Sequence, residues 1–118
     1  MKKAIGMAEF ITVSEGIAAT DRMIKTAEID VIEAQTVCPG KYIVIISGEI
    51  SAVNAAVEAA KTHHGAKLID SFVLGNPHES IFPAIYSNAE VTGAEALGVM
   101  ETFSAASAIF AADAAAKT

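Results

Sequence analysis

The sequence predicts an α+β fold whose elements follow one another in the order β-α-β-β-α-β. Three observations lead to this prediction. Four short segments are rich in apolar and β-branched residues, two segments between them show the three- and four-residue spacing of amphipathic helices, and turn residues stand at the junctions. This is the order of a ferredoxin-like sandwich, an architecture that carries many unrelated functions.

The first half of the chain predicts a strand, a helix and a hairpin. Residues 4–12 read as a strand, and Ser14 is the expected N-cap of the amphipathic helix that follows. Residues 29–37 and 41–47 predict two further strands. The Cys-Pro-Gly sequence between these strands has the composition of a turn, so we expect the two strands to form a hairpin.

The second half predicts a helix, a strand and a short helical segment. Ser51 is the expected N-cap of a helix that ends near His64, with Gly65 at the C′ position. Residues 67–74 predict the fourth strand. A Gly-Asn-Pro sequence breaks this strand, and a short helix is expected over residues 79–84.

The C-terminal segment repeats the N-terminus at an offset of 92 residues, with 8 identities in 23 positions. The identical pairs are Ala4/Ala96, Gly6/Gly98, Glu9/Glu101, Ile17/Ile109, Ala19/Ala111, Asp21/Asp113, Lys25/Lys117 and Thr26/Thr118. We therefore expect one domain over residues 1–90, and over residues 95–118 the incomplete start of a second repeat, consisting of a strand and a helix. Such a unit must dock on the first domain, pair with another chain or be disordered.

The composition narrows the function. Hydrophobic residues make up 53% of the chain and the mean hydropathy is +0.44, yet no apolar run approaches the roughly 20 residues that span a bilayer. The excess alanine suits subunit contacts, and the net charge of −6 argues against nucleic acid and anionic membranes. A single cysteine and no signal-like start favour the cytoplasm.

Several motifs resemble one protein family. Residues 4–10 (AIGMAEF), 21–25 (DRMIK) and 47–53 (SGEISAV) resemble the BMC domain of bacterial microcompartment shell proteins, and the likeness extends over residues 4–86. Residues 36–42, 74–78 and 82–85 are more narrowly similar to the tandem-domain iron–sulfur shell proteins of propanediol-utilisation compartments, a branch whose two domains would explain the repeat.

The resemblance implies a structural, non-enzymatic protein in the shell of a cytoplasmic microcompartment. Shell proteins of this family form flat six-sided tiles, either as hexamers of one-domain chains or as trimers of two-domain chains, with a pore at the symmetry axis. Tiles meet edge to edge, so the expected partners are other copies of this chain and other shell proteins. The pore passes small metabolites, and an axial cluster would also pass electrons.

Cys38 is the candidate metal ligand. From the residues alone, a lone cysteine is more often a small packed hydrophobe than a ligand. The resemblance implies that Cys38 gives one ligand per subunit to a [4Fe–4S] cluster on the axis, and because one thiolate cannot hold a cluster, symmetry must supply the others. The pore loop that the resemblance implies comprises Thr36, Val37, Cys38, Pro39, Gly40 and Lys41.

A second set of candidates concerns the edge of the tile. Asp21 and Lys25 stand four residues apart on one predicted helix, and from spacing alone they form a surface pair. The resemblance implies that Lys25 lies at the tile edge. The other edge candidates are Asn76, Pro77 and His78.

The sequence also bears on two other classes of function. An enzyme is disfavoured because no catalytic triad, carboxylate pair or phosphate-binding glycine loop is present. A small cytosolic regulatory oligomer that uses Cys38 for a redox response remains the alternative to the shell tile.

Overall fold

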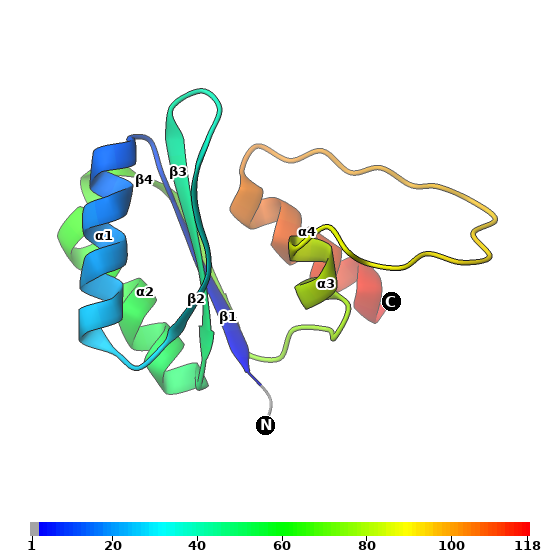
Figure 1. Ribbon diagram of the computed structural model, residues 1–118, viewed down its shortest axis with the longest axis horizontal. Coiled ribbons are helices and arrows are strands. Elements are labelled where there is room, and N and C mark those ends of the chain that lie inside the picture. The colour runs from blue at the N-terminus through cyan, green and yellow to red at the C-terminus, as the bar shows by residue number, and fades with distance from the viewer. Residues whose placement is uncertain (1–2) are drawn as a thin grey trace.

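The computed structural model describes residues 3–118 and folds them around one four-stranded antiparallel sheet (Figure 1). The elements follow the predicted order, and two further helices come after the fourth strand. Their bounds are β1 (Ala4–Phe10), α1 (Val13–Thr26), β2 (Asp30–Val37), β3 (Lys41–Gly48), α2 (Ile50–His64), β4 (Leu68–Leu74), α3 (Ile81–Ile85) and α4 (Ala105–Lys117). The predicted α+β fold class is confirmed.

Strand β1 lies inside the sheet, whose order is β2-β3-β1-β4. Met7, for example, pairs with Ile45 of β3 on one side and with Phe72 of β4 on the other. All seven residues of β1 are buried, because helices cover both faces of the sheet as well (Figure 1). Successive side chains of a strand point to opposite faces, so β1 contributes to two separate cores.

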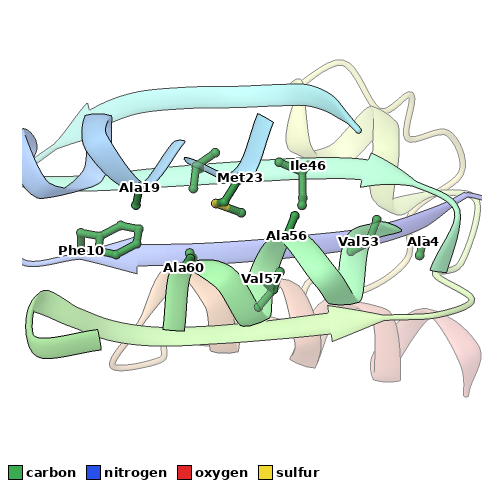
Figure 2. Close-up of a cluster of buried hydrophobic side chains, with 11 residues drawn as sticks. Ala4, Phe10, Ala19, Met23, Ile46, Val53, Ala56, Val57 and Ala60 are labelled. Atoms are coloured by element: carbon green, nitrogen blue, oxygen red, sulfur yellow. The ribbon is translucent and has the colours of Figure 1, made fainter. Parts of the chain in front are cut away.

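The first core lies between the sheet and helices α1 and α2 (Figure 2). Phe10 and Met23 are its largest fully buried members. Gly6 permits close packing here, since a Cβ atom on it would lie 2.7 Å from Cγ1 of Val53 and 2.9 Å from Cγ2 of Val57. The glycine in β1 is therefore a packing requirement set by helix α2.

The second core lies on the opposite face of the sheet, under α3 and α4 (Figure 1). Its buried members are Ile5, Met7, Ile43, Ile45, Ile81 and Ala106. Phe72 of β4 and Phe110 of α4 meet edge to face, with ring centroids 6.3 Å apart and an interplanar angle of 86°. The C-terminal helix thus docks on the first domain, which is one of the three outcomes expected for the extension.

The strand expected at the start of the extension is absent from the described chain. Residues 96–102 are irregular and exposed, with Leu97 at 90% and Val99 at 78% of full exposure. The corresponding strand β1 is held by hydrogen bonds to β3 and β4. Within residues 3–118 no strand lies beside residues 96–102, so their backbone has nothing to pair with.

Three predicted helix caps are wrong. Thr12 caps α1 in place of Ser14, because its Oγ1 accepts a hydrogen bond from the backbone N–H of Glu15 at 3.4 Å. Helix α2 begins one residue after Glu49, which has no capping side-chain hydrogen bond, so Ser51 lies inside the helix. Gly65 has a φ of −62° because the chain continues into a short 3-10 helix, Gly65–Lys67.

The packing around Gly6 gives a testable prediction. Gly6→Ala should lower the free energy of unfolding by about 1–3 kcal/mol, because the added methyl group overlaps Val53 and Val57. Gly98, its counterpart in the repeat, is the matched control, since no atom lies within 4 Å of a Cβ placed there. Chemical denaturation of both variants measures the difference, and equal effects would contradict the packing argument.

Candidate functional site

The predicted pore loop is the turn of the β2–β3 hairpin, which projects beyond the N-terminal beginning of α1 (Figure 1). The backbone N–H of Gly40 donates to the carbonyl of Val37 at 3.1 Å and closes the turn. Gly40 has a φ of +90°, a left-handed conformation that favours glycine. Cys38 is a free, exposed cysteine in this turn. The thiol is therefore open to solvent or to a partner, unlike a packed structural cysteine.

The described residues of a single copy do not provide a complete metal site. Within residues 3–118 no three His, Cys, Asp or Glu side chains are grouped so that they could hold a metal ion. Cys38 is the only cysteine in the sequence, whereas a [4Fe–4S] cluster takes about four cysteine ligands. An exposed thiol at the tip of a hairpin fits such a cluster only as the contribution of one copy among several.

Glu9 connects the base of the β2–β3 hairpin, which carries the predicted pore loop, to helix α4. It lies in β1 and is only 2% exposed. Its Oε1 accepts hydrogen bonds from the backbone N–H groups of Ala105 at 2.9 Å and Ala106 at 3.4 Å, and Lys41 Nζ lies 3.8 Å from Oε2. The first N–H groups of a helix have no partner within the helix and carry partial positive charge, so a carboxylate suits this place. Glu9 thus anchors the beginning of α4.

Asp70 of β4 forms a second anchor beside Glu9. Its Oδ2 accepts hydrogen bonds from the hydroxyl groups of Ser104 at 2.7 Å and Ser107 at 3.3 Å. Ser104 is also the N-cap of α4, and its Oγ accepts from the backbone N–H of Ser107 at 3.0 Å. Two carboxylates of the first domain therefore fix the N-terminal turn of α4.

The other end of α4 meets the loop of the predicted edge residues Asn76, Pro77 and His78, which we call the edge loop. Asp113 is only 5% exposed and accepts hydrogen bonds from the backbone N–H of His78 and from Lys117 Nζ, both at 2.7 Å. Burial alone would raise the pKa of Asp113, but Lys117 and the two hydrogen bonds outweigh it and hold the pKa below its ordinary value. The carboxyl group therefore stays ionised at neutral pH.

The two groups of edge candidates are separated in the structure. Asn76, Pro77 and His78 line a surface depression together with Lys117. Asp21 and Lys25 form an exposed ion pair of 2.8 Å on α1, which lies on the opposite face of the sheet from α4 (Figure 1). The edge loop thus meets the Asp113–Lys117 pair of the extension instead of the Asp21–Lys25 pair.

Comparison with known proteins identifies the family. The family model of the BMC domain matches residues 4–77 of this chain. The chain belongs to the BMC-domain family. This establishes the resemblance seen in the motifs and accounts for the four-stranded sheet with its two main helices. The BMC-domain shell proteins are structural components of the microcompartment shell and not enzymes, which agrees with the absence of a catalytic set in the sequence.

Three relatives show how far the likeness extends. The bacterial microcompartment shell protein PduT of Citrobacter freundii is 38% identical over 117 residues, which is 99% of this BMC chain and 64% of that protein. The carboxysome shell protein CsoS1 of Prochlorococcus marinus is 36% identical over 85 residues, covering 70% of this chain and 82% of that one. A crystal structure of a microcompartment protein from Desulfitobacterium hafniense DCB superimposes with a TM-score of 0.86 at 46% identity.

The three relatives match different shares of this chain. The carboxysome protein matches 70% of this BMC chain, whereas the Desulfitobacterium structure matches all of it and PduT nearly all. This chain in turn spans 64% of PduT and 66% of the Desulfitobacterium chain.

Among residues 3–118, no helix of this BMC protein is both long and apolar enough to cross a membrane.

Sequence reasoning did not assign a role to Glu9. The signal was present, because Glu9 is an acidic residue in an otherwise apolar segment and such residues are rarely buried without a partner. Its partners, however, are backbone N–H groups 96 and 97 residues away in the BMC chain, and Lys41. Only the docking of α4 brings these groups together.

The Glu9 anchor gives a second prediction. Glu9→Gln should weaken the docking of α4 by about 1–3 kcal/mol, because the neutral amide accepts the two N–H groups less strongly and no longer attracts Lys41. Amide hydrogen exchange along α4 should accelerate while exchange in α2 stays unchanged. Glu28→Gln is the control, since Glu28 is exposed. Unchanged exchange in α4 of the Glu9 variant would contradict the anchor.

Proposed function

We propose that the protein is a subunit of a homo-oligomeric shell tile in which the hairpin turn of residues 36–41 from each copy faces a pore at the symmetry axis. The observation that carries this proposal is the docking of α4 on the face of the sheet opposite α1 and α2, which we call the outer face (Figure 1). It supplies a pattern for packing one BMC unit against the next, and repetition of that pattern closes a ring. The shell-protein names of its relatives support the same role.

The tile would be built from two BMC repeats per chain, the second of which begins at about residue 95. Helices α1 and α4 support this organisation, because Thr12 and Ser104 are 92 residues apart, both are N-caps, and each accepts the N–H three residues further on. The ion pairs also correspond, with 2.8 Å between Lys25 and Asp21 and 2.7 Å between Lys117 and Asp113. By this proposal α4 is the α1 helix of the second repeat.

The turn would serve both as the rim of the pore and as the place where copies share a metal. Small metabolites would pass through the opening that the turns enclose. The thiolates of Cys38 from several copies would hold a [4Fe–4S] cluster, which when bound supplies one-electron transfer. Because Gly40 has no side chain and the turn is exposed, neighbouring turns can approach one another closely.

The assembly test combines the molar mass with the edge candidate Lys25. The wild-type protein, produced from its whole gene, should have a molar mass by light scattering that is several times the mass of one chain, and it should form flat sheets in the electron microscope. Lys25→Ala should keep the molar mass and reduce the sheets, because Lys25 is 74% exposed on α1 and available to a neighbouring tile. Lys61→Ala, a similarly exposed lysine on α2, is the control.

The assembly test has two decisive outcomes. A monomeric wild-type protein would overturn the tile. An oligomer that never forms sheets would instead support the redox-responsive regulatory oligomer, for which the exposed thiol of Cys38 is the favourable observation.

The cluster is tested separately. After anaerobic reconstitution the wild-type oligomer should contain iron and sulfide, and Cys38→Ser should lose both while keeping its molar mass, because Cys38 is the proposed ligand and the single cysteine among residues 1–118. Thr36→Ser, in the same hairpin, is the control and should retain iron. Equal iron content in the wild type and the Cys38 variant would refute the cluster and leave the tile intact.

A further inference from the structure

Helices α1 and α4 begin in the same way, but only the beginning of α4 is fully capped. In α4 the N-cap Ser104 accepts from the N–H of Ser107, and Glu9 accepts from the N–H groups of Ala105 and Ala106. In α1 the N-cap Thr12 accepts from the N–H of Glu15. These interactions satisfy three N–H groups in the first turn of α4 and one in that of α1.

The remaining N–H groups of α1 belong to Val13 and Ser14, the counterparts of Ala105 and Ala106 at the offset of 92. No hydrogen bond reaches either group from the described part of the chain, residues 3–118. They point out of the positive end of a 14-residue helix, where a carboxylate is the favoured partner. Within the same chain, the equivalent N–H groups at the beginning of α4 are bound by a carboxylate, that of Glu9.

The side of α1 next to this end is also uncovered. Gly16, Ala19 and Met23 face its own sheet and are buried, whereas Ile17 is 55% exposed on another side. The counterpart of Ile17 in α4 is Ile109, which packs in the second core against the outer face of the sheet. Helix α1 therefore presents to solvent an apolar residue at the position that α4 uses for docking.

A receiving surface of the matching kind lies in the exposed segment 96–102. Its residues Leu97, Val99 and Glu101 are the counterparts of Ile5, Met7 and Glu9 in β1. Those three residues of β1 lie on the outer face of the sheet and contact α4 or the core beneath it. All three residues of the segment are exposed. The residues that β1 places against α4 and its core therefore have counterparts in segment 96–102 that are open to a partner.

We propose that Glu101 of one copy caps helix α1 of a second copy by accepting hydrogen bonds from the backbone N–H groups of Val13 and Ser14, while Leu97 and Val99 pack against Ile17 of that copy. The contact between chains would thus reproduce the contact that Glu9 makes with α4 within the chain. The proposal rests on the proposed function, because it requires that copies associate in a ring.

Cross-linking in the protein produced from its whole gene tests this contact. In a Cys38→Ser background, chains carrying Ser14→Cys are co-expressed with chains carrying Glu101→Cys and treated with a short thiol-specific cross-linker. A cross-linked dimer should form. Glu95→Cys replaces Glu101→Cys in the control, and it should give only background, because six residues of extended chain span roughly 20 Å.

A second variant tests the cap itself. Glu101→Gln should weaken self-association by about tenfold or more and accelerate hydrogen exchange at Val13 and Ser14, whereas Glu95→Gln should change neither. An oligomer of normal mass without the Ser14–Glu101 cross-link would overturn the cap and leave the tile standing. A monomer would overturn both, and equal cross-linking by positions 95 and 101 would overturn the assigned register.

Discussion

Buried carboxylates fix helix α4 on the sheet, and the most deeply buried of them is that of Glu9. One oxygen of this group accepts the first N–H groups of α4, and the other faces the ammonium group of Lys41. A carboxylate as buried as this one is stable only when such partners replace the water it has lost. The same interaction fixes α4 on the sheet and lies at the base of the hairpin that carries Cys38. The docking surface and the predicted pore loop are therefore coupled through a single side chain.

The order of the elements and the core under helices α1 and α2 followed from the sequence, because they depend on apolar spacing and turn residues within short windows, whereas the core under α4 depends on the docking of the extension. The Cys-Pro-Gly turn is an example. The helix caps were less predictable, since Thr12 and Ser14 are both good capping residues two positions apart. The strand expected at residues 96–102 depends on neighbouring strands that local sequence does not supply, and in the described chain it stays irregular.

The candidate site was predictable only in part. The place of Cys38 in a turn followed from the sequence, and the exposure of its side chain is a finding of the structure; family motifs indicated the predicted pore loop. The partners of Glu9 and Asp113 did not follow, because each bond joins residues far apart in the sequence through a docking event. Periodicity reports which side of an element is buried, but it does not report what covers that side. The internal repeat held more of this information than any single motif, since it identified helices α1 and α4 as equivalent and so allowed their surroundings to be compared.

The long connection between α3 and α4 has a thermodynamic consequence. Residues 86–104 form a long loop that extends away from the sheet, returns to α4 and tethers this helix to the sheet that receives it (Figure 1). A tethered helix meets its docking surface at an effective concentration that for short flexible linkers is on the order of millimolar. This contact therefore does not weaken as the protein is diluted, unlike a contact between separate chains. In a ring of such chains, the joints made within each chain persist at any concentration, and only the joints between chains limit assembly.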